Sequence, residues 1–276
     1  MTSEAIYDVV VVGGGGSGLA AAIEARAVGR DVVLLEKNLQ LGGSTAWSIG
    51  SVTASQTPHQ ARKGIVDNPA DHWRDMAGFN GELEARDNAD LRRLLADEMP
   101  ETFRWLLNHG VRFYGPMPEP PHSKPRMHNV LPNSRAFITH LSKAARRAGV
   151  KIECGTRATA LVAENGRIVG IDCATASGPR RLRARGGVVL AAGYFTSDPE
   201  SSAGATTVGR SRAAPSCTAR WTPWKTRGGC LRVSTGNARF TPRFRLVPCA
   251  RGPSCSTRFP RWSSAKTALS WARRNC

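Results

Sequence analysis

Six residues near the start of the chain, Gly-Gly-Gly-Gly-Ser-Gly at positions 13–18, constrain its fold more than any other feature. An apolar, β-branched run at 7–12 precedes them and predicts a buried strand. An Ala-rich segment with helical spacing follows at 19–28, and Gly29 is placed to end that helix. A second apolar strand is predicted at 31–35. Together these elements predict a strand–helix–strand unit, which implies a parallel sheet with a right-handed crossover.

The glycine turn has the spacing of a dinucleotide-binding motif. Gly13 permits the sharp turn out of the strand, Gly15 lets the backbone approach a pyrophosphate, and Gly18 lets the helix pack closely on the strand. The helix that begins near Ser17 offers free N–H groups and its positive dipole end to phosphate. Glu36 closes the second strand and would accept hydrogen bonds from ribose hydroxyls. A carboxylate at this position argues against the 2′-phosphate of NADP.

Two other interpretations of these residues stay open. A glycine-rich turn with no nucleotide is the alternative for the motif, although the surrounding strand–helix–strand pattern argues against it. Lys37 is either a ribose contact or a solvated charge at the end of the strand, and the solvated charge is favoured.

The rest of the ordered pattern completes an α/β protein. We expect mainly helix at 68–109, with Pro100 opening a new helix, and a Pro-rich, basic loop at 114–132. An amphipathic helix is predicted at 134–148. Strands are predicted at 150–154, 158–163, 168–175, 180–184 and 187–192. The predicted fold class is a Rossmann-like parallel sheet with helices and a small β-meander, followed by an irregular C-terminal tail.

The segment Leu-Gly-Gly-Ser-Thr-Ala-Trp-Ser-Ile-Gly at 41–50, which follows the acidic residue, carries a family resemblance. With it, in order, come matching stretches at 8–22, 36–50, 137–150, 156–162, 166–170 and 184–195. The chain resembles the flavoprotein family of fumarate reductase and succinate dehydrogenase, which includes L-aspartate oxidase and the 3-ketosteroid dehydrogenases. The resemblance implies an FAD-dependent oxidoreductase that transfers a hydride between the flavin and a substrate with an activated C=C or CH–CH bond.

The resemblance also implies which residues contact FAD. The turn would hold the pyrophosphate and Glu36 the adenosine ribose, while residues 43–45 would line the path to the flavin. Gly50 would lie near the isoalloxazine, Ala158 would meet the adenine through its backbone, and Ala192 with Gly193 would close the site. The full set is Gly13, Gly15, Gly16, Ser17, Gly18, Glu36, Lys37, Gly43, Ser44, Thr45, Gly50, Ala158, Ala192 and Gly193. Succinate dehydrogenases attach the flavin to a His where this chain has Ser44, so we expect non-covalent FAD.

The family's catalytic residues are not recognisable in the sequence. In the family they belong to a capping domain that follows a Gly-Gly-Phe segment, where this chain has Gly-Tyr-Phe at 193–195, and no motif after Ser197 matches that domain. We therefore assign no catalytic residue and expect weak or absent turnover from this chain. A substrate-attracting cluster is one interpretation of Lys124, Arg126, His128 and Arg135, against the favoured one of solvated loop charges. Tyr114 is either a proton relay or, as we favour, a plain packed or half-exposed side chain, and Cys154 and Cys173 are expected in the core.

The last part of the chain differs in composition from the first. The formal net charge is +18, and no Asp or Glu occurs after Glu200. We place an FAD-binding domain at 1–199, incomplete because the capping domain is missing, and a basic tail at 200–276. A translation in the wrong reading frame is the favoured explanation of the tail. The alternatives are a disordered arm that binds nucleic acid and a small domain of unknown type.

Composition and spacing limit the partners. We expect a small-molecule substrate, either a carboxylate or an enone, and no nucleic acid; the electron partner cannot be named. The cysteines contain no CxxC pair, so no metal site is predicted. The longest apolar runs are strand-sized, which excludes a membrane span, and the first residues lack a secretory pattern, so a cytoplasmic location is expected.

Overall fold

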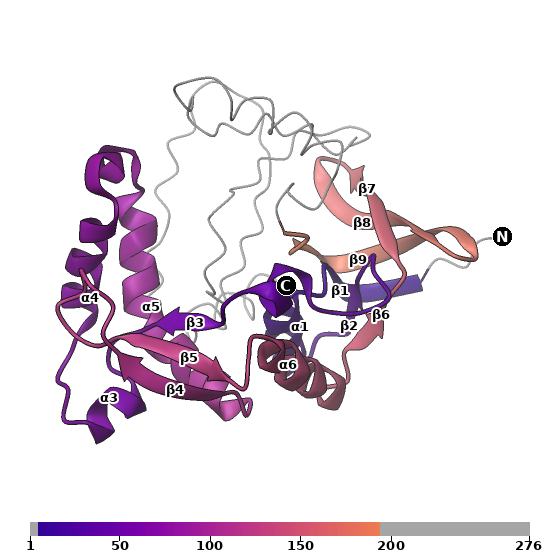
Figure 1. The fold of residues 1–276 in the computed structure, drawn as a ribbon. Coiled ribbons are helices and arrows are strands. Elements are labelled where there is room, and N and C mark those ends of the chain that lie inside the picture. Colours follow the sequence, from indigo (N-terminus) through magenta and orange to yellow (C-terminus); the bar gives the residue numbers. More distant parts are fainter. Residues whose placement is uncertain (1–4, 194–276) are drawn as a thin grey trace, which may run out of the picture.

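The computed structural model describes residues 5–193, which form two sheets with helices packed against them (Figure 1). The α/β fold class predicted from the sequence is confirmed. The predicted boundary at residue 199 and the predicted tail at 200–276 lie outside the described residues.

Four parallel strands form the part of the larger sheet that carries the glycine turn. Their order across the sheet is β6-β2-β1-β9. The strands are β1 (Ala5–Val12), β2 (Val32–Leu35), β6 (Lys151–Glu153) and β9 (Gly178–Leu190). Helix α1 (Gly16–Ala27) joins β1 to β2, as the turn and the Ala-rich run predict. Because Val12 lies opposite Leu35 in the register, β1 and β2 end at the same edge of the sheet.

Strand β9 is longer than predicted, because the segments expected at 180–184 and 187–192 form one strand. Its C-terminal half pairs in parallel with β1. Its N-terminal half pairs antiparallel with β8 (Arg167–Thr175), which in turn pairs with β7 (Arg157–Glu164). The register of β9 against β1 shifts between Tyr7 and Val9, where Gly186 allows close approach: a Cβ there would lie 2.9 Å from the Asp8 carbonyl oxygen. β9 joins the two halves of the sheet, because Leu182 and Arg183 pair with β1 along one edge and with β8 along the other.

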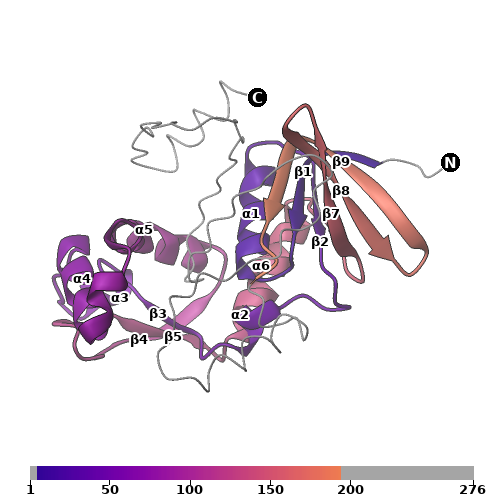
Figure 2. The same cartoon turned by 90° about the horizontal axis from the view of Figure 1, so that it is seen from above.

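The larger sheet has an apolar core on each face. Helices α1 and α6 (Arg135–Arg147) cover one face, with Leu19 and Leu141 fully buried between them and the sheet. The meander of β7, β8 and β9 lies on the other face, where Leu182 packs in the same cluster as Val33. Figure 2 shows the helices and the meander on opposite sides of β1.

The smaller sheet has the antiparallel order β3-β5-β4 and carries the remaining helices. Its strands are β3 (Ser51–Thr53), β4 (Arg112–Met117) and β5 (Met127–Leu131). Around it lie α3 (Pro58–Arg62), α4 (Pro69–Met76), two 3₁₀ helices (Ala77–Phe79 and Gly81–Arg86) and α5 (Ala89–Asn108). Helix α2 (Gly43–Trp47) lies on the path from β2 to this sheet.

Two local predictions about this region need correction, one in part and one in full. At the two ends of the loop expected at 114–132, residues 114–117 belong to β4 and 127–131 to β5, while 118–126 form a loop as predicted. The inward side chains of these strands pack on α5: the rings of Phe113 and His128 each lie 4.6 Å from that of Phe103. Pro100 does not open a new helix but lies buried inside α5, beside the buried Met99. We attribute this to the packing of the helix face, which outweighs the hydrogen bond that proline removes. None of the helices among residues 5–193 is long and apolar enough to cross a membrane.

Candidate functional site

The glycine turn lies at the carboxyl ends of β1 and β2, the edge where ligands bind in open α/β sheets. The Gly13 N–H donates to the Leu35 carbonyl oxygen at 2.7 Å, which ties the turn to the end of β2. The Gly42 N–H donates to the Gly14 carbonyl oxygen at 3.0 Å, which brings the segment before α2 onto the same turn. Three segments separate in sequence therefore meet at this edge.

The fold itself requires two of the glycines. Gly13 has φ +109°, and a Cβ there would lie 2.3 Å from the Ala191 carbonyl oxygen. A Cβ on Gly18 would lie 1.9 Å from the Gly13 carbonyl oxygen, so helix α1 can pack this closely only without a side chain. These are the turn and packing requirements that the motif implies.

Gly15 is different, because the protein has room for a side chain there. Its φ is −81°, and a Cβ would be in ordinary contact with the Gly42 oxygen at 3.8 Å and Thr45 Oγ1 at 3.9 Å. Gly15 is also the N-cap of α1 and has no side chain to cap the helix. The amides in the first turn of a helix lack partners within it, so this end presents N–H donors and an open cradle. Those features fit a phosphate group.

Glu36 lies directly beside the turn. Its side chain is buried, and Oε2 accepts a hydrogen bond from the Gly14 N–H at 2.8 Å. Oε1 accepts from the Asn38 N–H at 2.9 Å. Each carboxylate oxygen can accept two hydrogen bonds, so each retains capacity for a ribose hydroxyl. Lys37 is exposed.

The segment around α2 supplies the opposite wall. Thr45 Oγ1 accepts a hydrogen bond from the Gly16 N–H at 3.2 Å. Gly43 and Ser44 are exposed beside it. Gly50 has φ +84°, and a Cβ there would lie 2.5 Å from Val130 Cγ1, so this glycine is required where the chain enters the smaller sheet.

The structure brings some of the other expected cofactor residues to the site. Ala192 and Gly193 follow β9, and a Cβ on Gly13 would lie 3.0 Å from the Ala192 Cα. Ala158 is half-buried on β7, opposite Cys173. The segment just before β7 contacts the site through Thr156, whose N–H donates to the Glu36 carbonyl oxygen at 2.9 Å.

The sequence interpretation missed the part that Gly14 plays. A Cβ on this residue would lie 2.4 Å from Leu41 Cδ2 and 3.1 Å from Glu36 Oε2. The available signal was the second glycine in the run, which the GxGxxG spacing does not require.

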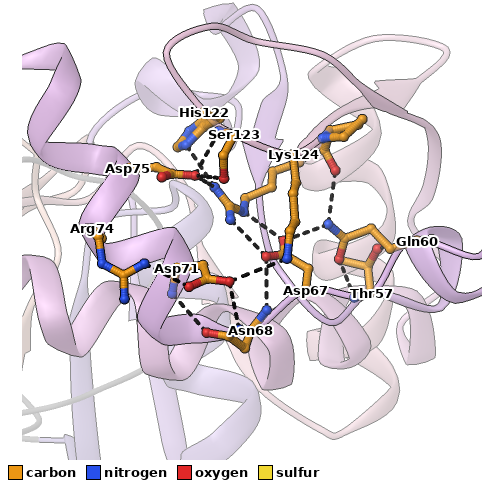
Figure 3. A network of polar contacts seen from close by, with 12 residues as sticks. Thr57, Gln60, Asp67, Asn68, Asp71, Arg74, Asp75, His122, Ser123 and Lys124 are labelled. Carbon is orange, nitrogen blue, oxygen red and sulfur yellow. Dashed lines mark hydrogen bonds and ion pairs between the residues drawn. The ribbon is translucent and has the colours of Figure 1, made fainter.

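Arg126 and Lys124 belong to a network of ion pairs. The favoured interpretation as a solvated loop charge is therefore wrong for Arg126. Arg126 is fully buried, and its Nε and Nη2 donate to the two oxygens of buried Asp67 at 2.7 and 2.8 Å. Its Nη1 donates to Asp75, while Lys124 pairs with Asp71 at 3.3 Å. Figure 3 shows these carboxylates converging on the loop before β5. Burial alone would raise the pKa of Asp67, but the hydrogen bonds from Arg126 and Gln60 outweigh it and lower the pKa below its ordinary value.

The other individually predicted side chains have mixed outcomes. His128 is fully buried, with Nε2 3.1 Å from Thr57 Oγ1. It is therefore neither a solvated loop charge nor part of a substrate-attracting cluster. Arg135 is exposed and lies over the Trp47 ring at 5.4 Å. Tyr114 is exposed on β4. Cys173 is buried as predicted, whereas the prediction for Cys154 is wrong, because it follows the last residue of β6 and is exposed.

The parallel sheet, the glycine turn and the buried acid at the end of β2 define a nucleotide-binding α/β protein. The family described as FAD binding domain matches residues 8–243, and the chain belongs to this family. Its cofactor is FAD, and the resemblance to fumarate reductase and succinate dehydrogenase flavoproteins is confirmed. The match extends past the predicted boundary at residue 199, whose position stays a prediction.

Individual relatives are longer than this chain. The NADH:fumarate oxidoreductase of Klebsiella pneumoniae (strain 342) is 36% identical over 107 residues, covering 38% of this chain and 11% of the relative. The urocanate reductase of Eggerthella lenta is 33% identical over 206 residues, covering 70% of this chain and 32% of the relative. The solved 3-ketosteroid-Δ4-(5α)-dehydrogenase of Rhodococcus jostii RHA1 is 28% identical with a TM-score of 0.64, covering 72% of this chain and 48% of that one.

Proposed function

We propose that this chain is the FAD-binding part of an oxidoreductase that reduces or forms an activated C=C bond in a small carboxylate or enone. One observation carries the cofactor site: the N-terminus of α1 has an open cradle at Gly15, next to the buried carboxylate of Glu36. The names of the relatives, a fumarate oxidoreductase, a urocanate reductase and a ketosteroid dehydrogenase, support the substrate class.

In this proposal the chain's own residues bind and orient the cofactor. The amides of Ser17 and Gly18 donate to the pyrophosphate, and Glu36 accepts from the adenosine ribose. FAD supplies hydride transfer when bound. The other proposed contacts are Gly13, Gly15, Gly16, Lys37, Gly43, Ser44, Thr45, Gly50, Ala158, Ala192 and Gly193. Ser44 has no imidazole, so the cofactor is held without a covalent bond.

Flavin binding by the purified chain tests the cofactor site. We expect a flavin absorbance spectrum, with the flavin released into the supernatant when the protein is precipitated with acid. The Gly15→Ala variant should keep its unfolding temperature, since the fold has room for the methyl group, and should bind FAD about tenfold more weakly, a loss of about 1.4 kcal/mol. Unchanged affinity in this variant would contradict the proposed cradle, and flavin that stays with the precipitate would contradict non-covalent binding.

Reoxidation of the reduced flavin tests the activity. Fumarate, urocanate and a steroid enone would each be added to the photoreduced protein without oxygen. We expect slow reoxidation by one of them at most, because no described residue is assigned as the acid catalyst. Bound flavin with no response to any alkene would favour a non-catalytic FAD-binding module. We also propose a cytoplasmic location, which fractionation of cells that express the tagged chain would test.

A further inference from the structure

Two side chains hold the glycine turn from opposite sides. Glu36 accepts the Gly14 N–H from the β2 side, and Thr45 accepts the Gly16 N–H from the α2 side. Gly15, with the open cradle, lies between the two tethered amides. We propose that Glu36 and Thr45 are positioning residues that hold this turn in its ligand-binding shape before the ligand arrives. The identity of the ligand rests on the proposed function, whereas the hydrogen bonds that hold the turn do not depend on it.

The tethers form a closed circuit of hydrogen bonds around Gly15. Glu36 attaches to this circuit from the end of β2 through the Gly14 N–H, and the Gly14 carbonyl oxygen accepts from Gly42 at 3.0 Å. The Gly42 carbonyl oxygen accepts from the Ala46 N–H at 3.3 Å, in the helix that carries Thr45. The Thr45 hydroxyl then returns to Gly16. Loss of the Thr45 hydroxyl therefore opens the circuit, and loss of the Glu36 side chain removes the hydrogen bond by which the end of β2 holds Gly14.

Burial makes the Glu36 tether strong. The residue is 6% exposed, and a buried carboxylate is tolerated only when hydrogen bonds replace its hydration. Hydrogen bonds from backbone N–H groups to a carboxylate are among the stronger ones in proteins. A Cβ on Gly14 would lie 2.4 Å from Leu41 Cδ2, so the turn has no room for a side chain on this side. Glu36 therefore acts on the ligand through the turn, in addition to any contact with ribose.

Thr45 holds the first amide of α1 from outside the helix. An N-cap side chain accepts from the second or third amide, whereas Thr45, 29 positions away, accepts from the first, that of Gly16. This arrangement does not use the amides of Ser17 and Gly18, which the proposed function assigns to the pyrophosphate. The Thr45 oxygen accepts this bond, which leaves its own proton free to donate to a phosphate oxygen. Serine can replace threonine in this role, whereas valine cannot.

Amide hydrogen exchange of the apo chain is the first test. We expect exchange in residues 13–18 to become about tenfold faster in Glu36→Ala and in Thr45→Val, which is the effect of losing one charge-assisted or capping hydrogen bond. Thr45→Ser should match the wild type, as should the control Glu164→Gln, which alters an exposed carboxylate on β7. Unchanged exchange in both test variants would overturn the inference.

A ligand pair separates positioning from direct contact. ADP carries the ribose hydroxyls, and 2′,3′-dideoxy-ADP lacks them. If Glu36 positions the turn, Glu36→Ala weakens binding of the dideoxy ligand about tenfold as well; if Glu36 acts only through ribose, that ligand binds both proteins equally and the inference fails. If neither ligand nor FAD binds the wild type while exchange still rises in both variants, the proposed function falls and the positioning of the turn stands.

Discussion

Replacement of Arg126 by Met should remove about 3 kcal/mol from the free energy of unfolding. The side chains of Arg126 and Asp67 are both fully buried, and breaking such a pair costs about 3–5 kcal/mol because an uncompensated charge remains. Asp67 would lose two hydrogen bonds from the guanidinium and keep those from Gln60 and Asn68, at 2.8 and 2.9 Å. We therefore expect the lower end of the range.

Urea denaturation followed by tryptophan fluorescence measures this loss. The matched control is Arg93→Met, which breaks an exposed pair with Asp97 on α5 and should cost less than about 1 kcal/mol. Adding Asp67→Asn to Arg126→Met should recover part of the loss, because it removes the stranded charge. If Arg126→Met cost no more than Arg93→Met, or if the second substitution made it worse, the argument from burial would be refuted.

Two further predictions concern pH and the turn. Burial lowers the pKa of both His72 and His128 to about 4, whereas unfolded histidine titrates near 6.5. The unfolded state therefore binds more protons between these values, and the free energy of unfolding should fall as the pH drops from about 6.5 to 4. The urea midpoint measured at pH 7 and at pH 5 gives this loss. The variant His128→Gln should show a smaller difference between the two midpoints. Gly18→Ala should destabilise the protein by about 2 kcal/mol, because its Cβ would meet the Gly13 oxygen, and a melting temperature equal to that of wild type would contradict it.

The first 36 residues could be predicted from the sequence because their signals are local. The close approach of Gly18 to the Gly13 carbonyl oxygen lies within one strand–turn–helix segment, and the structure shows it. The close approach of Gly13 to Ala191, after β9, is a distant contact that the local spacing does not reveal. Glu36 was placed beside the turn for the same reason. The hydrogen bond from the Gly14 N–H to Glu36 was not predicted. The motif relates its glycines and the acid to the bound nucleotide and says nothing of a contact between them.

Residues in the smaller sheet were harder to predict because distant partners decide their environment. Arg126 appears in a Pro-rich, basic stretch, where a solvated charge is the usual outcome. Its partners Asp67 and Asp75 are 59 and 51 residues away, so no local pattern indicates that the guanidinium is buried. The strands β4 and β5 were missed for a related reason: their alternation is short, and the aromatic ring of Phe103 that covers them comes from another element.

The position of β1 between β2 and β9 has a consequence for synthesis on the ribosome. β2 follows β1 within a few tens of residues, but the other edge of β1 pairs with a strand that ends at Leu190. That edge stays unpaired until almost two hundred residues have been made, and an unpaired apolar edge is a template for aggregation. Pairings of such long range also form slowly. We therefore expect a translational pause before β9 to raise the insoluble fraction of the nascent protein.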